Sequence, residues 1–536
     1  MTIAITGEIT AAQDLNDDLV IERTGLVRAG PTAITMSGAN AIKIFGSVYG
    51  TEIGIRAVPF AQLSIGSTGI VHGEVTAVSV SWGAVIHNAG QISTLVGSRG
   101  TGILAEGSAN AITNTGSIEA YYGIRAGMGG REETIINTGT ILSSGGVGIE
   151  VNGAGWITNG GTIQSLQGVG IRLLNTPSGS NNWITNTGTI RGATAIEGSD
   201  RIDVITNTGN IIGTVDLGDG NDRYEGRNGY TDGLILLGNG NDTFRGGAAW
   251  ETIVGGAGDD LIDGGSGDAD AVQFLGNGNI AVDLRISGPQ DTGEGRDTLI
   301  DIEQAYTGNG ADRLTGNSGD NGFHAGGGND TLDGGLRNDT IWGGDGIDTL
   351  AFSGSTAATV DLGLVLTPQN TGYGLDVLYQ IENVSGGSGA DRLTGDGGAN
   401  VLAGNGGKDR LSGGDGDDTL TGGAGNDILT GGAGRDVFVF DAARSKNVDT
   451  IGNYAVADDT IHLQNSVYTK IGASGVLASK AFWSGKKAHD ASDRIIYDKG
   501  TGALYYDADG TGKAAQIKIG QLTKNLKMSA AEFFVI

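Results

Sequence analysis

The chain contains no cysteine and only five prolines, and basic residues are scarce beside acidic ones. Without cysteine, disulfide bonds are excluded as a source of stability. A helix that crosses a bilayer needs about 20 mostly apolar residues in a row, and no such run occurs, so no membrane span is expected. The 33 Lys and Arg residues face 61 Asp and Glu residues, which gives a net charge of -28. An acidic surface of this kind repels nucleic acid, so no nucleic-acid partner is expected.

The residue present in excess is glycine, with 101 copies in 536 residues. The hydrophobic fraction of 38% is nevertheless ordinary for a globular chain, which argues against disorder throughout. The first ten residues contain neither a basic segment nor an apolar core of the kind found in cleaved signal peptides. We therefore expect any export of the chain to use another signal.

A motif of the form Asn-x-Gly-x-Ile recurs between about residues 85 and 215. Its six copies begin at Asn88, Asn114, Asn137, Asn159, Asn186 and Asn207. Spacings of 21 to 27 residues indicate the coils of a parallel β-solenoid. Isoleucines two residues before and four after each Asn share parity and can face one core. The Asn side chains are predicted to stack as an internal amide ladder. Residues 1–84 carry weaker versions of the motif and are expected to form irregular opening coils or a cap.

Two outward-facing patterns in the predicted solenoid are candidates for function. The charged residue after each Gly-Ile pair alternates in sign along Arg125, Glu150, Arg172 and Glu197. Charged ladders also occur in polysaccharide-cleaving β-helices, but strict alternation of sign favours mutual pairing. Trp156 and Trp183 precede equivalent Asn residues in adjacent coils and have outward parity. They are candidates for a sugar-binding platform or for a contact face with another subunit.

Glycine-rich nonapeptides of the form G-G-x-G-x-D-x-U-x, where U is apolar, dominate residues 216–440. The predicted metal ligands are Asp222, Asp242, Asp260, Asp312, Asp330, Asp339, Asp348, Asp391, Asp409, Asp418, Asp427 and Asp436. Glycines allow a tight turn that exposes backbone carbonyls, and each Asp adds a hard carboxylate oxygen, which is the ligand chemistry of Ca²⁺. One buried apolar side chain per repeat is too little for independent folding, so the stack is expected to need its neighbours and calcium.

The nonapeptide region contains a long duplication. A shift of 79 residues carries Asp339 onto Asp418 and Asp348 onto Asp427. Each copy contains an interruption, at about 271–306 and 351–385, followed by a run of repeats. Glu251, Asn321 and Asn400 occupy the Asp position in three repeats, and these turns are predicted to be weak or empty calcium sites.

The nonapeptides resemble those of the RTX family, also called the hemolysin-type calcium-binding repeat family. Residues 441–536 are similar to the C-terminal domain of serralysin-type secreted proteins, and 493–510 are predicted to form a hairpin. This resemblance implies that a type I secretion apparatus reads an uncleaved C-terminal signal. It also implies that the chain is exported unfolded and folds on external calcium. The N-terminal part resembles solenoid adhesins and passenger domains only loosely.

Catalytic signatures of related secreted proteins are not found in the sequence. The five histidines never form His-Glu-x-x-His, and no Gly-x-Ser-x-Gly elbow occurs. The Tyr-Gly and Asp-Pro-His pattern expected of RTX alginate epimerases is also missing. No catalytic residue is predicted, and a non-enzymatic role is favoured.

The sequence therefore predicts an all-β protein in four parts. These are opening coils (1–84), a parallel β-solenoid (85–215), a calcium-binding parallel β-roll (216–440) and a small C-terminal β domain (441–536). The expected function is that of an extracellular or cell-surface structural protein, resembling a surface-layer subunit or an adhesin. Its expected partners are calcium, further copies of itself and surface polysaccharide. The alternative is a polysaccharide lyase or epimerase that uses the N-terminal solenoid.

Overall fold

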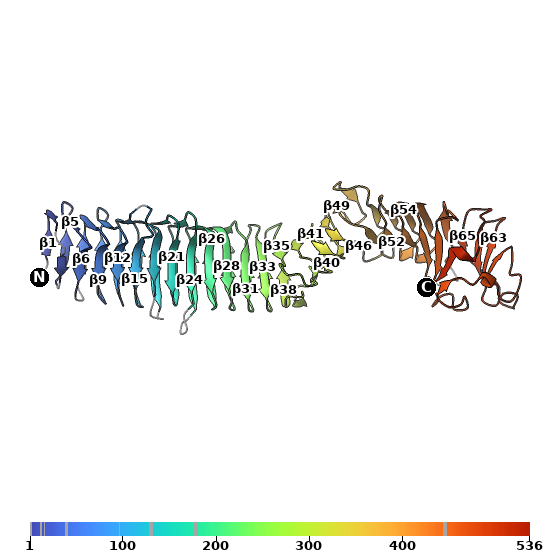
Figure 1. The fold of residues 1–536 in the computed structure, drawn as a ribbon, viewed down its shortest axis with the longest axis horizontal. Coiled ribbons are helices and arrows are strands. Elements are labelled where there is room, and N and C mark those ends of the chain that lie inside the picture. Colours follow the sequence, from blue (N-terminus) through green and yellow to red (C-terminus); the bar gives the residue numbers. More distant parts are fainter. Residues whose placement is uncertain are drawn as a thin grey trace. The chain divides into compact units, whose positions relative to one another are not determined.

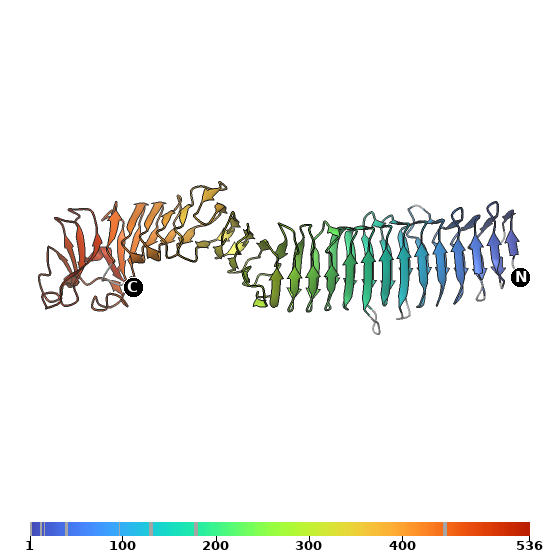
Figure 2. The same cartoon turned by 180° about the vertical axis from the view of Figure 1, so that it is seen from behind.

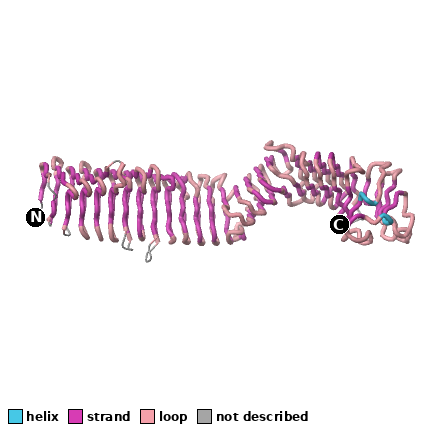
Figure 3. Tube along the Cα trace, in the orientation of Figure 1, coloured by secondary structure: helices cyan, strands magenta, loops and turns pink. Residues whose placement is uncertain are grey.

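The computed structural model describes residues 3–10, 13–15, 17–37, 41–95, 97–127, 132–175, 181–442 and 447–536. These residues form β-strands joined by short turns, with only two one-turn helices among them, η1 (Ser479–Ala481) and η2 (Ala530–Glu532) (Figure 3). The all-β prediction is confirmed. The chain divides into two compact units, Met1–Leu275 with Ile286–Ile302, and Gly276–Arg285 with Glu303–Ile536.

The first unit is a right-to-left series of stacked coils in Figure 2, and each regular coil contributes one strand to each of three parallel ladders. The first ladder contains β1 (Ile3–Ile5), β4 (Leu19–Ile21), β7 (Ala41–Ile44), β10 (Gln62–Ile65), β13 (Val85–Asn88), β16 (Ala111–Asn114), β19 (Glu133–Asn137), β22 (Gly155–Asn159), β25 (Asn182–Asn186), β27 (Asp203–Asn207), β29 (Arg223–Glu225), β32 (Thr243–Arg245), β34 (Leu261–Asp263) and β38 (Arg296–Ile300). A short strand, β37 (Gln290–Asp291), pairs antiparallel with β38.

The second ladder contains β2 (Glu8–Ile9), β5 (Leu26–Ala29), β8 (Ser47–Gly50), β11 (Ile70–Gly73), β14 (Gln91–Thr94), β17 (Ser117–Ala120), β20 (Thr140–Ser143), β23 (Thr162–Ser165), β26 (Thr189–Ser199), β28 (Asn210–Gly218) and β30 (Tyr230–Thr231). The third contains β3 (Gln13–Leu15), β6 (Thr32–Met36), β9 (Ile53–Ala57), β12 (Thr76–Val80), β15 (Thr101–Ala105), β18 (Tyr122–Ala126), β21 (Val147–Asn152), β24 (Val169–Leu174), β31 (Ile235–Asn239), β33 (Thr252–Ala257) and β35 (Ala271–Gln273). The long strands β26 and β28 belong to both ladders.

Buried isoleucine columns form the core of these coils. The predicted core residues Ile112, Ile135, Ile157, Ile184 and Ile205 are all buried, and they lie in register on β16, β19, β22, β25 and β27. Each buried isoleucine contributes roughly 1.5–3 kcal/mol. The glycine of each Gly-Ile pair allows close approach of neighbouring coils, because a Cβ on Gly148 would lie 2.6 Å from the carbonyl oxygen of Gly170.

The predicted amide ladder is also present. Asn88 Nδ2 donates to Asn114 Oδ1 at 2.7 Å, and the same bond links the six repeat Asn residues in succession through Asn207. For residues 1–84 the sequence predicts irregular opening coils or a cap. The described residues there form regular strands in the same three ladders. The aliphatic residues of β4, β7 and β10 keep the inward alternation although the Asn motif is absent, and this is why the coil persists.

The second unit contains shorter coils built from nonapeptides (Figure 1). One ladder contains β36 (Ala281–Asp283), β40 (Arg313–Thr315), β43 (Thr331–Asp333), β46 (Thr349–Ala351), β50 (Asn383–Ser385), β52 (Val401–Ala403), β55 (Thr419–Thr421), β58 (Val437–Phe440), β60 (Thr460–Leu463) and β66 (Phe533–Val535). A second contains β39 (Gln304–Tyr306), β41 (Gly322–His324), β44 (Thr340–Trp342) and β49 (Leu375–Tyr379), and a third contains β47 (Thr359–Asp361), β51 (Arg392–Thr394), β54 (Arg410–Asp415), β57 (Ile428–Ala433), β59 (Asp449–Gly452) and β65 (Ile517–Gln521). Short strands complete it: β42 (Gly327–Gly328) with β45 (Asp345–Gly346), β53 (Gly406–Gly407) with β56 (Ala424–Gly425), and β48 (Gln369–Asn370) antiparallel to β49.

The C-terminal residues continue the roll and then turn antiparallel. The predicted hairpin is confirmed, because β63 (Ile495–Asp498) pairs antiparallel with β64 (Ala503–Tyr506), which pairs in turn with β65. Two further strands, β61 (Gly475–Val476) and β62 (Phe482–Ser484), pair with β66 and β63. In the described part of the chain, no helix has the length and apolar character needed to cross a membrane.

Candidate calcium centres

Each predicted aspartate ligand lies at the end of a glycine turn, immediately before a short strand. The residue two positions later, such as Leu332 after Asp330 or Leu420 after Asp418, is buried in the core. Burial of this apolar side chain fixes the turn and places the Asp carboxylate in the interior of the coil. All twelve predicted Asp side chains are 2% exposed or less.

One oxygen of each carboxylate belongs to a hydrogen-bonded column that runs from coil to coil. Asp312 N donates to Asp330 Oδ1 at 2.7 Å, and Asp330 N donates to Asp348 Oδ1 at 2.8 Å. A second column links Asp391, Asp409 and Asp427 in the same way, at 2.8 and 2.9 Å. The partners lie 18 residues apart, so alternate nonapeptides form separate columns and two repeats make one coil.

The other carboxylate oxygen is buried and accepts no hydrogen bond from the described residues. This holds for eleven of the twelve, namely Asp222, Asp242, Asp260, Asp312, Asp330, Asp348, Asp391, Asp409, Asp418, Asp427 and Asp436. A buried anionic oxygen without a partner is costly unless a cation binds it. The donor set therefore fits calcium, which prefers carboxylate and carbonyl oxygens.

Burial raises the pKa of several of these carboxyls, among them Asp222, Asp330, Asp339 and Asp409. The pKa of Asp222 and of Asp339 rises to about 8, and that of Asp330 and Asp409 to about 7. Loss of solvation is the main cause, and the negative charge of neighbouring Asp residues adds to it. A bound divalent cation reverses this effect, because it stabilises the ionised form.

Turn glycines provide the space for the carboxylates. A Cβ built on Gly413 or Gly431 would overlap Oδ2 of Asp418 or Asp436. In most of these turns the residue two positions before the Asp is a glycine with a positive φ, as at Gly416 (φ 120°), a conformation that glycine adopts at little cost. The glycines of the turn are therefore needed to hold the carboxylate in its buried position.

No group of three or more His, Cys, Asp or Glu side chains suited to a metal ion occurs in the described residues. Each coil brings a single Asp to a column, so any ion held there takes its remaining oxygens from the glycine-rich backbone or from water. A calcium site in this protein is therefore recognised by the repeated glycine turn and not by a cluster of acidic side chains.

The fold and these columns define a calcium-binding β-solenoid protein. The family model of the RTX calcium-binding nonapeptide repeat (4 copies) matches residues 245–268, 306–336, 323–350, 381–411 and 403–438. No curated protein matches the chain. The chain thus carries RTX repeats that bind Ca²⁺. Asp222 and Asp242 lie outside the matched ranges but have the same burial and the same column bonds.

The Asn positions differ from the Asp positions in their hydrogen bonding. Asn321 Nδ2 donates to the carbonyl oxygen of Glu303 at 3.1 Å, and Asn400 Nδ2 donates to that of Glu382 at 2.7 Å. The side-chain amide of Asn therefore forms a hydrogen bond within the fold at the position where an Asp has a carboxylate oxygen without a partner. At Glu251, burial and the adjacent Asp270 raise the pKa to about 8. The amide bonds of Asn321 and Asn400 support weak calcium binding at those two positions. Glu251 keeps a buried oxygen without a partner among the described residues, as the Asp ligands do, and weak binding there stays a prediction.

Further aspartates continue the columns and are absent from the sequence-based set. Five of them accept the backbone N–H of a column residue in the preceding coil, as the predicted ligands do, and these are Asp270, Asp297, Asp376, Asp449 and Asp459. The sixth, Asp203, accepts Asn182 Nδ2 from the preceding coil and Ser199 N from its own. Asp297 and Asp376 end Gly-x-Gly-x-Asp segments that lie inside the interruptions, and this shortened pattern is the signal that could have found them. The hydroxyl of Thr292 donates to Oδ2 of Asp297, and the hydroxyl of Thr371 donates to Oδ2 of Asp376.

The column extends into the first solenoid with other polar residues. Asn110 N donates to Glu133 Oε2 at 3.1 Å, Gly155 N donates to Asn182 Oδ1 at 2.9 Å, and Asn182 Nδ2 donates to Asp203 Oδ1 at 2.7 Å. Glu133 is fully buried, and burial raises its pKa from 4.5 to about 7. The solenoid therefore contains a buried carboxyl, that of Glu133, whose Oε1 has no hydrogen-bond partner among the described residues. This residue lies far from the nonapeptides in sequence.

We expect the stability of the first unit to depend on pH through Glu133. Its folded pKa lies above the unfolded value, so its contribution is complete below about pH 4.5 and is lost as pH rises through about 7. A shift of this size corresponds to roughly 3 kcal/mol. Urea unfolding between pH 5 and 8, with calcium held constant, should show this loss, and Glu133→Gln should flatten it. An identical pH slope in the two proteins would contradict the assignment.

The outward patterns predicted for the solenoid have the expected geometry. Trp156 and Trp183 stack with ring centroids 4.2 Å apart and planes at 14°, and Trp156 is 44% exposed. In the charge ladder, Glu150 lies between Arg125 (2.7 Å) and Arg172 (3.7 Å). Arg172 also pairs with Glu197 at 2.8 Å. The charges therefore pair with one another, as their alternation predicts.

Proposed function

We propose that this chain is a secreted, calcium-binding structural protein of a bacterial cell surface or extracellular matrix, similar in role to a surface-layer subunit or an adhesin. The observation that carries the proposal is the set of buried carboxylate columns with unpartnered oxygens. They couple folding to external calcium, since the compact roll is unfavourable without a bound cation. We assign calcium to the twelve predicted Asp positions, with the two regular runs, Asp330 to Asp348 and Asp409 to Asp436, binding most strongly.

Calcium coupling supports export by a type I secretion apparatus. A chain that cannot complete its roll at the low calcium of the cytosol stays open for transport and folds outside. The proposed signal lies in residues 441–536. Deleting the last residues is a poor test, because β66 pairs with β60 and buries Phe533, so a deletion would damage the fold as well.

Export is better tested with the full chain. We expect it to accumulate in the medium of a bacterium that expresses a complete type I apparatus, and to remain inside a matched strain without the outer-membrane component. Mass spectrometry of the exported protein should show that residues 441–536 are retained. Equal export by both strains, or a processed C-terminus, would rule out this route.

The N-terminal solenoid is the proposed surface for self-association and for contact with polysaccharide. Identical positions repeat every coil, so weak contacts add along its length. Trp156 and Trp183 are the proposed contact face, because their stacked rings present apolar area at a half-exposed position.

We expect the double variant Trp156→Ala with Trp183→Ala to weaken association by about tenfold or more, as for aromatic residues at the centre of an interface. Sedimentation velocity at millimolar calcium measures the oligomer size, and pull-down on insoluble polysaccharide measures glycan contact. Trp250→Ala is the matched control, since Trp250 is 65% exposed in the same unit. Equal loss in the control and the double variant would exclude a specific face.

A polysaccharide lyase or epimerase is the second candidate, and one groove favours it. His72, Ser93 and Glu119 lie in register on β11, β14 and β17, and Tyr121 joins them around a groove of about 490 Å³. His72 Nδ1 lies 3.1 Å from Ser93 Oγ. A carboxylate, an imidazole and a phenol are groups that remove or donate protons. Release of unsaturated uronides by the full chain would replace the structural role with this activity.

A further inference from the structure

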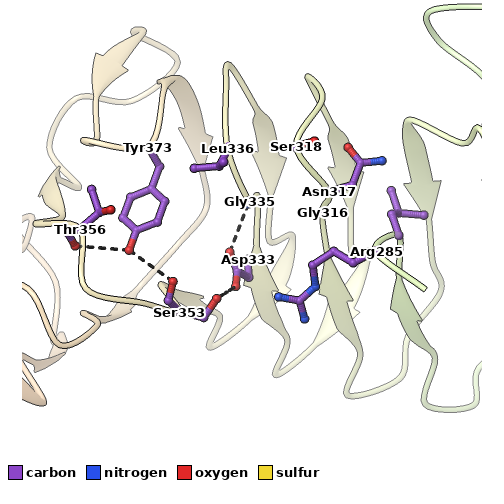
Figure 4. A pocket seen from close by; sticks show the side chains of 11 residues that line it. Arg285, Gly316, Asn317, Ser318, Asp333, Gly335, Leu336, Ser353, Thr356 and Tyr373 are labelled. Carbon is purple, nitrogen blue, oxygen red and sulfur yellow. Dashed lines mark hydrogen bonds between the residues drawn. The ribbon is translucent and has the colours of Figure 1, made fainter. Parts of the chain in front are cut away.

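A cleft of about 690 Å³ in the second unit is not explained by calcium binding. Figure 4 shows Arg285 after β36 and Tyr373 before β49 on either side of it, with Asp333 at the end of β43 between them. Its volume lies in the range of roughly 300–1,000 Å³ in which small-molecule sites occur.

The cleft has an apolar part and a polar part. Leu336, which is 50% exposed, and the ring of Tyr373 supply the apolar surface. The Tyr373 hydroxyl donates to the carbonyl oxygens of Thr356 (3.3 Å) and Ser353 (3.4 Å), which fixes the orientation of the ring. A ring held in this way loses little conformational entropy when a ligand stacks on it.

The polar part retains unused hydrogen-bonding groups. Nη1 of Arg285, Nδ2 of Asn317 and the hydroxyl of Ser318 have no hydrogen-bond partner among the described residues, whereas Nε and Nη2 of Arg285 bind Asp283. Asp333 accepts from the Ser353 hydroxyl at 3.0 Å and from Gly335 N at 3.1 Å. These groups suit a ligand with several hydroxyls.

The three side chains that define the cleft, those of Arg285, Asp333 and Tyr373, are not repeated in the other copy of the duplication. Aligned on the shared Val-Asp-Leu, the equivalent of Arg285 is Gly363, and the 79-residue shift relates Asp333 to Ser412 and Tyr373 to Glu294. The two copies make the same turns without them, so the fold does not require these side chains.

One turn beside the cleft departs from the repeat at a cost in backbone strain. Arg337, two residues before Asp339, has φ 76° at the position where the turns of Asp348 and Asp418 have glycine. Its N–H donates to the carbonyl oxygen of Tyr373 at 3.0 Å. A side chain in this left-handed conformation costs of order 1 kcal/mol. Strained residues are retained where the local shape matters, and here the strain lies next to Tyr373.

Charge decides which kind of ligand the cleft takes. The guanidinium of Arg285 forms two hydrogen bonds to Asp283, at 2.7 and 2.8 Å, so its charge is already compensated. Asp333 then leaves the cleft with a net negative charge. An anionic ligand such as a uronate would be repelled.

We propose that this cleft binds an uncharged saccharide, with one sugar ring stacked on Tyr373 and its hydroxyls bonded to Arg285 Nη1, Asn317 Nδ2 and Asp333. Both Asp333 and the turn at Leu336 lie between the predicted calcium ligands Asp330 and Asp339, so binding requires the calcium-loaded roll. The site is independent of the proposed assembly face at Trp156 and Trp183, and its test does not depend on that role.

The test uses the full calcium-loaded chain and isothermal titration calorimetry. The probes are tetrasaccharides of glucose, galactose and mannose, with tetragalacturonate as the anionic arm. We expect one neutral tetrasaccharide to bind and Tyr373→Ala to weaken its affinity at least about tenfold. Tyr373→Phe should retain most of the affinity because the ring remains. Asn317→Asp keeps the oxygen that accepts Gly319 N and removes the donor, so it should also weaken binding.

Tyr230→Ala is the matched control, because Tyr230 is 43% exposed in the other unit. Circular dichroism of each variant establishes that it folds. Binding of a neutral probe that Tyr373→Ala and Asn317→Asp reduce and Tyr230→Ala leaves unchanged supports the proposal. No binding of any neutral probe, binding that is indifferent to Tyr373, or preference for tetragalacturonate overturns it.

Discussion

Removing calcium should expand the nonapeptide region and abolish its β signal, while the N-terminal solenoid keeps its own. The structure gives the reason. Eleven of the predicted Asp ligands leave a buried oxygen without a partner among the described residues, and a carboxylate buried in this way is unfavourable until a cation binds it. The solenoid coils are instead held by the Asn ladder and isoleucine columns.

Far-ultraviolet circular dichroism and small-angle X-ray scattering with and without excess chelator measure this change. Limited proteolysis should then cleave within 216–440 and spare 85–215. The same amount of chelator already saturated with calcium is the control, and magnesium should not restore the roll because it demands a more rigid octahedral site. An unchanged spectrum of the calcium-free protein would refute calcium-dependent folding.

Replacing Asp418 by Asn should remove one calcium site, whereas the same change at its neighbour Asp417 should not. Asp418 is buried and its Oδ2 is unpartnered, while Asp417 is exposed and pairs with Arg435 at 2.7 Å. The two variants lose the same charge at adjacent positions. They therefore separate a ligand from the general acidity of the chain.

We expect Asp418→Asn to lower calcium affinity at its turn by about tenfold or more, because the number of ligand charges sets the affinity of calcium sites. Titration calorimetry should show about one ion fewer per chain, and the calcium midpoint of folding should rise. The substituted amide would then resemble that of the natural Asn400, which lies one coil earlier in the same column. Equal effects of the two substitutions would place the ion elsewhere.

Much of the fold follows from periodicity, because the repeat fixes which residues are neighbours. The position two residues after each Asp is buried throughout, as at Leu332 and Leu420, and the alternating charges of Arg125, Glu150 and Arg172 pair as their spacing predicts. Regular coils at residues 3–84 were harder to predict, since they share only the alternation of apolar residues and not the Asn motif. The boundaries of the four predicted parts remain predictions.

The calcium positions were predictable wherever the turn is complete. Asp297 and Asp376 were missed because their turns replace the first glycine by Thr292 and Thr371 and lie within interruptions. Asp203 was missed because it lies in a solenoid coil, outside any nonapeptide. Its place in the column depends on three-dimensional stacking, where Asp203 N meets Asp222 Oδ1 at 2.7 Å.

By itself the sequence determined that this is an all-β, calcium-binding repeat protein, because equal spacing in the chain becomes equal spacing in space. Only the tertiary structure decided what the interruptions bring together. Arg285, Asp333 and Tyr373 are separated by 48 and 40 residues and belong to no repeat, so no period relates them. Their meeting around one cleft depends on how the turns close in three dimensions, and that is where the proposed saccharide site lies.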